Sequence, residues 1–314
     1  MTAQTSPQIA AASKALAGNH GFSLISDEKL LALYAALLHG RMIEEQQRSG
    51  SGGNRGSKCG AGCGHEAPVV ATCIDLHRED TLVAPPDTLI HAFVKGAPLE
   101  SIAAWLAPSS SADAEGAQSR RSPGSLDSAS LASWNVVSPA SPEAVAVLNA
   151  GISAALTHKI ADDDKIVVVF FAGDAEDPDS REALHFTLEQ QLPMLLVLHA
   201  TTPQSNHRGT GKSSQNAAVV PLRRIASFGI PCLPVDGADM VAIYRAASES
   251  IARIRQGRGP TLLECIDVAD GLDPIAKMEA YLDRKGLFQP IFKELTQATF
   301  TAALAAAGQV SPWT

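Results

Sequence analysis

The chain of 314 residues has a formal net charge of −8 at pH 7, and 45% of its residues are hydrophobic. This length and composition predict a soluble globular protein with a large α/β domain. Lysines and arginines are scattered through an acidic chain, which argues against nucleic acid as a partner. The sequence has no run of about 18 apolar residues and no apolar core in its N-terminal segment. We therefore expect a cytoplasmic protein without a membrane span or signal peptide.

The chain falls into three predicted parts. Residues 1–25 are rich in small side chains, which is typical of a flexible leader. We expect one α/β domain over residues 26–290 and a helical tail over residues 291–314. A Ser-rich stretch at about residues 108–142 has the composition of an extended loop inside that domain.

The block from residue 165 to residue 201 predicts a βαβ unit. Ile166–Phe171 is a continuous β-branched and aromatic run, which indicates a strand buried on both faces, and Met194–Leu198 has the same character. Between them, apolar residues recur at helical spacing, and Asp179 or Ser180 can cap the first turn. We therefore expect a mostly parallel sheet with helices on both faces.

A glycine and an acid follow the first of these strands directly. Gly173, Asp174 and Ala175 come after the apolar run at the point where the strand gives way to the helix. Ligands of open parallel sheets bind beyond the carboxyl ends of the strands. These residues therefore stand where a phosphorylated cofactor and its metal would be held, with Asp174 as an oxygen ligand.

Several segments match one known family in the same order. The stretch AGDA, followed by REALHF and QLPMLLVL, resembles the thiamine-diphosphate-binding segment of the alpha subunit of the first, decarboxylating component of 2-oxo acid dehydrogenases, such as pyruvate and branched-chain 2-oxo acid dehydrogenases. Five further segments resemble the same family, namely Leu30–Glu45, Gly64–Ala67, Phe228–Ala247, Gly259–Cys265 and Asp273–Leu287.

The resemblance implies a fold, an activity and partners. The fold is the thiamine-diphosphate-binding α/β fold, and the activity is oxidative decarboxylation of a 2-oxo acid with acyl transfer to lipoamide. The implied cofactors are thiamine diphosphate and magnesium. The implied partners are a beta-type subunit, in a heterotetramer of two alpha and two beta chains, and a lipoyl-bearing acyltransferase. Because the beta-type subunit supplies the glutamate that activates the thiazolium, an alpha chain alone is half an active site.

The residues that the family uses to hold the cofactor are largely replaced in this chain. The family's asparagine pair aligns with Ala200 and Thr201, which leaves Asp174 as a partial magnesium site. The Tyr-Arg pair that grips the diphosphate aligns with Pro86 and Asp87, and a carboxylate there would repel the diphosphate.

Other family positions differ as well. Gly60 stands near the place of an upstream histidine, and residues 267–271 lead into Asp273 without the family's histidine loop. The segment Ala140–Glu143 replaces a Gly-x-Val-Gly stretch that packs on the aminopyrimidine. His91 is the remaining catalytic candidate, because the family also tends to have histidine there, although a hydrogen-bonded histidine near a helix start is an equal interpretation.

These replacements favour a non-catalytic paralogue over a working dehydrogenase. We expect an alpha-type chain that is catalytically impaired or inactive and acts as a structural or regulatory subunit. The alternative is an active thiamine-diphosphate-dependent enzyme when the chain is paired with a beta subunit. A third hypothesis keeps the cleft but changes its ligand, because Asp87 and Glu143 favour a neutral or cationic molecule over a diphosphate.

Two further patterns have competing interpretations. Cys59, Cys63 and His65 offer zinc ligands, but they lack a matching second pair, and the intervening glycines favour a loop before a helix. Gly209–Ser213 is similar to a phosphate-binding loop, but residue 206 is Asn where that motif needs glycine, so we expect an ordinary surface loop.

Overall fold

The computed structural model describes seven stretches of the chain, namely residues 25–50, 66–85, 89–107, 128–172, 177–200, 229–266 and 273–309. The chain divides into two compact units, which we call the helical unit and the sheet unit. The helical unit comprises residues 1–78, 87–136 and 274–314, and the sheet unit comprises residues 79–86 and 137–273. The leader, the domain over residues 26–290 and the tail over residues 291–314 stay predictions.

Six strands of the described residues form one sheet. They are β1 (Thr81–Val83), β2 (Val136–Val137), β3 (Val167–Ala172), β4 (Met194–Ala200), β5 (Cys232–Asp236) and β6 (Thr261–Ile266). The strand order is β2-β1-β3-β4-β6-β5, and the neighbours from β1 to β5 pair in parallel. The predicted mostly parallel sheet is therefore confirmed, and the strand expected over Ile166–Phe171 begins and ends one residue later.

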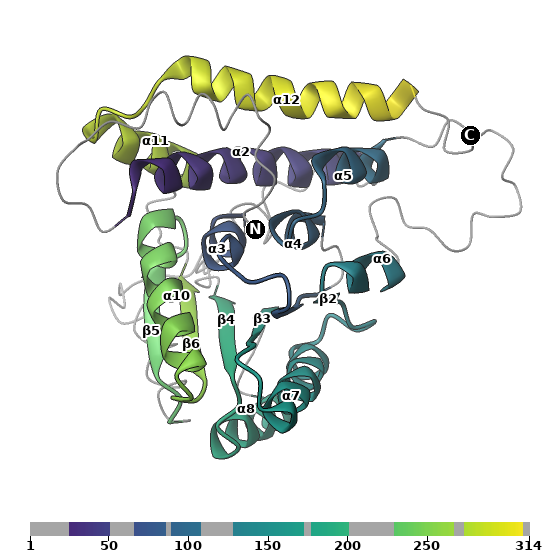
Figure 1. Ribbon diagram of the computed structural model, residues 1–314, viewed down its shortest axis with the longest axis vertical. Coiled ribbons are helices and arrows are strands. Elements are labelled where there is room, and N and C mark those ends of the chain that lie inside the picture. Colours follow the sequence, from purple (N-terminus) through teal and green to yellow (C-terminus); the bar gives the residue numbers. More distant parts are fainter. Residues whose placement is uncertain are drawn as a thin grey trace, which may run out of the picture. The chain divides into compact units, whose positions relative to one another are not determined.

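Three helices of the sheet unit connect these strands. They are α7 (Ala144–Ala161), α8 (Pro178–Glu189) and α10 (Met240–Arg255). Helices α7 and α8 lie side by side in Figure 1, and their apolar side chains share one core cluster with β3, β4 and β6. The β3-to-β4 and β5-to-β6 connections run in opposite directions along the sheet, so right-handed crossovers put α8 and α10 on opposite faces. Helices on both faces were predicted, and this part of the fold class is confirmed.

The cap of α8 differs from the sequence-based prediction. The N-cap residue is Asp177, whose carboxylate accepts hydrogen bonds from the amides of Asp179 and Ser180, each at 3.0 Å. The expected caps, Asp179 and Ser180, were therefore wrong. The helix starts earlier because Pro178 occupies the first helical position, where its fixed φ and missing amide hydrogen cost nothing.

Helix α7 is mainly apolar. By length and composition it could cross a membrane, with a mean hydropathy of 1.3 over 18 residues. Core helices of globular proteins meet the same criterion, and α7 contributes buried side chains to the core cluster, namely Val147, Leu148, Ile152 and Ala155. The absence of a membrane span stays a prediction.

The helical unit consists of α2 (Asp27–Gly50), α3 (Glu66–Cys73), α4 (Leu89–Val94), α5 (Leu99–Leu106), α6 (Ser128–Ser133), α11 (Pro274–Arg284) and α12 (Pro290–Gln309). Figure 1 shows α12, in yellow, running beside α2. The two helices are joined by Tyr34, which stacks on Phe292 with 6.1 Å between ring centroids, and by His39, whose Nε2 lies 3.2 Å from the carbonyl oxygen of Thr296. Burial lowers the pKa of His39 to about 4, so this histidine is neutral and structural.

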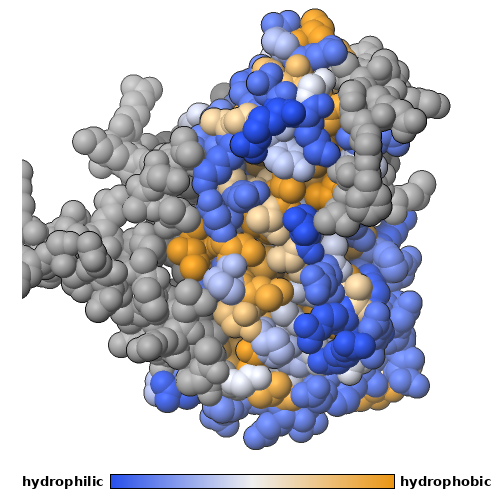
Figure 2. Space-filling view, turned by 90° about the vertical axis from the view of Figure 1, so that its left-hand side faces the viewer, coloured by the Kyte–Doolittle hydropathy of each residue, from blue (hydrophilic) through white to orange (hydrophobic). Residues whose placement is uncertain are grey.

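Strand β5 forms one edge of the sheet and is partly open to solvent. The side chain of Leu233 is 37% exposed and its neighbour Pro234 is also exposed. Figure 2 views the molecule from the side on which β5 and α10 are drawn in Figure 1, and hydrophobic residues lie there between hydrophilic ones. An apolar edge strand of this kind is a surface on which another chain can pack.

Candidate functional site

The carboxyl ends of the sheet-unit strands meet at one edge of the sheet. Residue pairing aligns Ala200 at the end of β4 with Ile266 at the end of β6, and Ile266 with Asp236 at the end of β5. Strand β3 ends at Ala172, paired with His199. We call this edge the carboxyl edge, and it is where ligands of open parallel sheets bind.

The residues predicted to hold the cofactor lie between the described ends of β3 and α8. Gly173, Asp174 and Ala175 fall outside the described residues, so their cofactor-binding roles, and the magnesium ligand Asp174, stay predictions. Other positions from the sequence analysis also fall outside them, namely Cys59, Gly60, Cys63, His65, Pro86, Asp87, Thr201, Gly209–Ser213 and residues 267–271. Within the described residues, no group of three His, Cys, Asp or Glu side chains could hold a metal ion.

The first turn of α8 carries a carboxylate at the carboxyl edge. Helix N-termini bind phosphates through free amide hydrogens and the positive end of the helix dipole. Here Asp177 already accepts hydrogen bonds from two of those amides. Hydrogen bonds from Ser180, and a weaker contribution from Asp179, lower the pKa of Asp177, so its carboxylate is ionised at neutral pH. An anion at this end of α8 would meet a negative charge.

The first turn of α7 also presents an acid. The last turn of α7 contacts the start of β1, where His158 meets Thr81, so the first turn lies toward the carboxyl edge. Glu143 is the N-cap residue of α7, and its exposed side chain makes no capping hydrogen bond. The segment Ala140–Glu143, predicted to replace a Gly-x-Val-Gly stretch of the resembling family, therefore ends in a carboxylate at the start of α7.

The acids at two helix starts of the carboxyl edge disfavour the binding of a diphosphate there. Asp177 and Glu143 add negative charge at two helix starts, and β4 ends at Ala200, whose residue type offers no oxygen ligand. A diphosphate needs amide hydrogens, cations or a metal with a full set of oxygen ligands. The side chains of Asp177 and Glu143 supply acceptors only.

His91 occupies α4 in the helical unit, whereas the carboxyl edge belongs to the sheet unit. Its side chain is buried, with 9% of its surface exposed. The catalytic role considered for His91 stays a prediction.

Sequence reasoning missed one buried acid close to the carboxyl edge. Glu264 lies on β6, two residues before the strand ends, and is fully buried with 0% of its surface exposed. Its cross-strand partners are Leu198 and Pro234. The signal was present, because Glu264 is the one charged residue in the apolar run TLLECI.

The surroundings of Glu264 are apolar. Within the part of the chain that the structure describes, Oε1 has no hydrogen-bond partner, and Oε2 lies 4.0 Å from Cys232 Sγ. Burial raises the pKa of Glu264. Burial, and then the charge of Glu264, raise the pKa of the Cys232 thiol to about 12, so this thiol is not a reactive thiolate at neutral pH.

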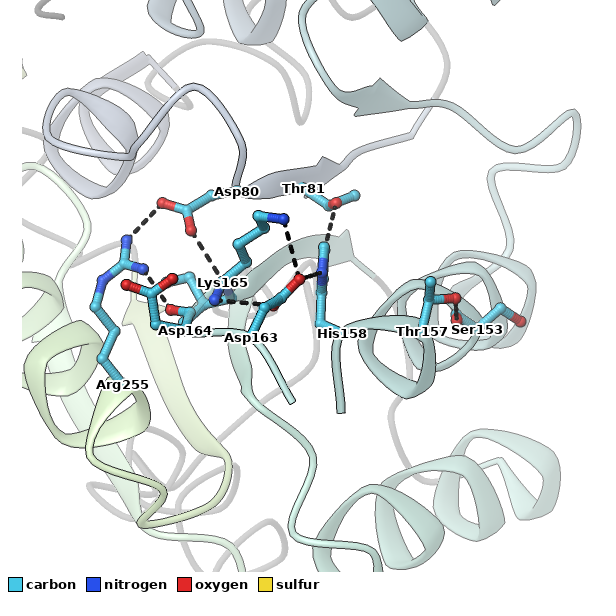
Figure 3. Close-up of polar contacts among 10 residues, drawn as sticks. Asp80, Thr81, Ser153, Thr157, His158, Asp163, Asp164, Lys165 and Arg255 are labelled. Atoms are coloured by element: carbon cyan, nitrogen blue, oxygen red, sulfur yellow. Dashed lines mark hydrogen bonds and ion pairs between the residues drawn. The ribbon is translucent and has the colours of Figure 1, made fainter. Parts of the chain in front are cut away.

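A second polar cluster lies at the opposite, amino ends of the strands (Figure 3). The buried carboxylate of Asp80 accepts a hydrogen bond from the amide of Ile166 at 3.1 Å and pairs with Arg255 Nη2 at 2.6 Å. The same guanidinium donates from Nη1 to the carbonyl oxygen of Asp164 at 2.8 Å. These contacts tie the starts of β1 and β3 to the last turn of α10.

The amino ends also hold a Thr-His-Asp array. In Figure 3, His158 lies between Thr81 and Asp163, with Nε2 at 3.1 Å from Thr81 Oγ1 and Nδ1 at 3.2 Å from Asp163 Oδ2. Asp163 also pairs with Lys165 at 3.0 Å. The spacing resembles a nucleophile with its base, but ligands of open α/β sheets bind at the other edge. We interpret the array as a structural link between α7 and β1.

Comparison with known proteins identifies relatives of the chain. A family model described as Dehydrogenase E1 component matches residues 34–268. The alpha subunit of acetoin:2,6-dichlorophenolindophenol oxidoreductase from Bacillus subtilis (strain 168) is 27% identical over 206 residues, covering 65% of this chain and 58% of the relative. The alpha subunit of 3-methyl-2-oxobutanoate dehydrogenase from Mycobacterium tuberculosis (strain CDC 1551 / Oshkosh) is 28% identical over 172 residues, covering 47% of this chain and 46% of the relative.

A longer match is the alpha subunit of the pyruvate dehydrogenase E1 component from Porphyra purpurea, which is 24% identical over 246 residues, or 77% of this chain and 70% of the relative. The chain spans about half the length of the first curated relatives that it matches. Among solved structures, transketolase from Campylobacter jejuni has a TM-score of 0.49 at 16% identity, covering 88% of this chain and 46% of that one.

Proposed function

Because the chain belongs to the dehydrogenase E1 component family, we propose that it is an alpha-type subunit that has lost catalysis and serves a beta-type chain as a structural or regulatory partner. The match spans residues 34–268 and so includes most of the sheet unit. The relatives described above are alpha subunits by name. They act on different substrates by name, so we assign no substrate to this chain.

The main support for a loss of catalysis is the capping of α8 by Asp177. In this chain the carboxylate of Asp177 takes the two amide hydrogens that an anionic cofactor group would use. The acid at Glu143 and the alanine that ends β4 also support a loss of cofactor binding. An alpha-type chain needs its fold to hold a partner even when its own half of the site no longer binds thiamine diphosphate.

The apolar edge strand supports a partner contact. Leu233 and Pro234 expose hydrophobic surface on β5, and a subunit interface would bury such surface. We propose a beta-type chain as that partner, in a hetero-oligomer. Docking to a lipoyl-bearing acyltransferase and a cytoplasmic location remain proposals on the family resemblance alone.

The alternative is an active thiamine-diphosphate-dependent dehydrogenase formed with a beta subunit. It is favoured by Gly173 and Asp174, which follow β3 directly at the expected strand end. In that case Asp174 would supply one carboxylate ligand to magnesium, the bound cofactor would supply the carbanion chemistry, and the beta chain would supply the missing groups.

The test of the proposal is purification of the tagged chain from its own host, with mass spectrometry of what accompanies it. We expect a beta-type subunit in roughly equal amount, and the same yield of that subunit with the Asp174→Ala variant. A chain that elutes as a monomer in size-exclusion chromatography, without a beta-type subunit, would refute the proposed role.

A further inference from the structure

An acid cluster joins α2 to α3 in the helical unit. Arg41 on α2 donates from Nε to Oε1 of Glu66 at 2.6 Å, and its Nη2 also pairs with that carboxylate. Glu66 is the first residue of α3 and is 0% exposed. A fully buried carboxylate is stable only when it is paired, so this ion pair is a structural requirement of the α2–α3 junction.

A second carboxyl group lies in the same cluster. Glu44 is on the same face of α2, three residues after Arg41, and its buried Oε2 has no hydrogen-bond partner among the described residues. The charged groups of the described residues that act on Glu44 are Glu66 from α3, and Arg48 and Arg41 from α2 itself. Arg41 is already engaged by Glu66, and the side chain of Arg48 is exposed. Ionisation of Glu44 would therefore place two carboxylates beside one partly exposed guanidinium.

The helices leave little space to relieve that repulsion. At Gly40, a Cβ atom would lie 2.8 Å from Ile90 Cδ1 and 3.2 Å from Glu66 Cβ, so α2 and α3 are in direct contact one residue before Arg41. Gly40 is what permits this approach. Two ionised carboxylates in such a junction repel each other in a medium of low dielectric constant.

We propose that the α2–α3 junction is a proton-dependent clamp, which is closed while Glu44 and Glu66 share one proton beside Arg41 and loosens when that proton leaves. The clamp holds the described end of α2 to the start of α3. It is independent of the proposed loss of catalysis, because none of its residues belongs to the carboxyl edge.

The direction of the pH dependence follows from the carboxyl group of Glu44. Burial, and then the charge of Glu66, raise the pKa of Glu44 from 4.5 to about 8. The folded chain therefore binds more protons than the unfolded chain between these two pH values. The stabilisation by protonated Glu44 is fully present below about pH 4.5 and is lost as the pH rises through about 8.

The first test is urea unfolding at pH 6 and pH 9 for the wild-type chain and two matched variants. We expect the wild-type midpoint to fall between pH 6 and pH 9, and the fall to be at least halved in Glu44→Gln, which replaces the carboxyl group by a neutral amide of similar size. Glu45→Gln changes the exposed neighbouring acid and should keep the wild-type fall. An undiminished fall in Glu44→Gln would overturn the clamp.

A second pair of measurements keeps the proposal testable if Glu44→Gln does not fold. Arg48 lowers the pKa of Glu44, so Arg48→Gln should move the loss of stability to higher pH, and no movement would count against the clamp. Hydrogen exchange in the wild-type chain, corrected for the intrinsic pH effect, should accelerate in the Glu66–Cys73 peptide at pH 9 but not in the Met240–Arg255 peptide. Equal acceleration of both peptides would overturn a local clamp.

Discussion

Glu264 is a buried acid with one oxygen that has no hydrogen-bond partner among the described residues. An unsatisfied buried polar atom costs roughly 1–3 kcal/mol of stability. The residues paired across the sheet in register with Glu264 are apolar, namely Phe171, Leu198 and Pro234. The thiol of Cys232, near Oε2, is only a weak hydrogen-bond donor. The raised pKa of Glu264 favours the protonated form, which reduces that cost without removing it. Among the described residues, no hydrogen bond to Oε1 offsets the rest of that cost.

Replacing this acid by an apolar residue of similar size should stabilise the chain. We expect Glu264→Leu to raise the free energy of unfolding by about 1 kcal/mol at neutral pH, because the unsatisfied oxygen is removed and the apolar row is completed. Glu264→Gln, which keeps a polar group, should not produce this gain. Urea unfolding measures both, and a loss of more than about 2 kcal/mol in Glu264→Leu would mean that the carboxyl group has a partner that it needs.

At the scale of secondary structure, side-chain contacts join the amino ends of the strands in the sheet unit. The Asp80 carboxylate accepts hydrogen bonds from the amide of Ile166 and the guanidinium of Arg255. One side chain therefore links β1, β3 and α10. Arg255 is only partly exposed, which limits screening of the pair by water. Truncating one partner of such a pair leaves a buried charge and an unpaired amide.

The Asp80→Ala variant should therefore lose about 3 kcal/mol of unfolding free energy. The matched control is Asp164→Ala, because Asp164 is exposed and contributes only its backbone carbonyl to Arg255. That control should stay within about 0.5 kcal/mol of the wild type. Chemical denaturation measures the free energy of unfolding of both variants. Equal values would show that the pair of Asp80 and Arg255 makes no net contribution to stability.

Local patterns predicted the elements better than their connections. The strands around Ile166–Phe171 and Met194–Leu198 were found within two residues, because a buried parallel strand is a continuous apolar run. The cap of α8 was misplaced, because the effect of Pro178 on the helix start was overlooked. The pair between Asp80 and Arg255 joins residues 175 apart in sequence, and nothing in a local pattern indicates it.

For the whole molecule, the family assignment rests on segments spread along the chain, and it agrees with the match over residues 34–268. The sequence correctly predicted a parallel sheet whose strand ends gather at one edge. A lone charge in an apolar run was the only sequence signal of Glu264. Nothing in the sequence indicated the acid cluster of α2 and α3, because it depends on which side chains the fold buries together. Burial without a partner is a property of the tertiary structure and has no sequence motif.

The central proposal is an alpha-type subunit that no longer binds the family's cofactor. It is tested most directly by calorimetric titration of thiamine diphosphate with magnesium into the chain, isolated from its host with the subunits that accompany it. We predict no binding by the intact, folded complex. Micromolar binding that is lost in the Asp174→Ala variant would contradict the proposal and would favour the active dehydrogenase.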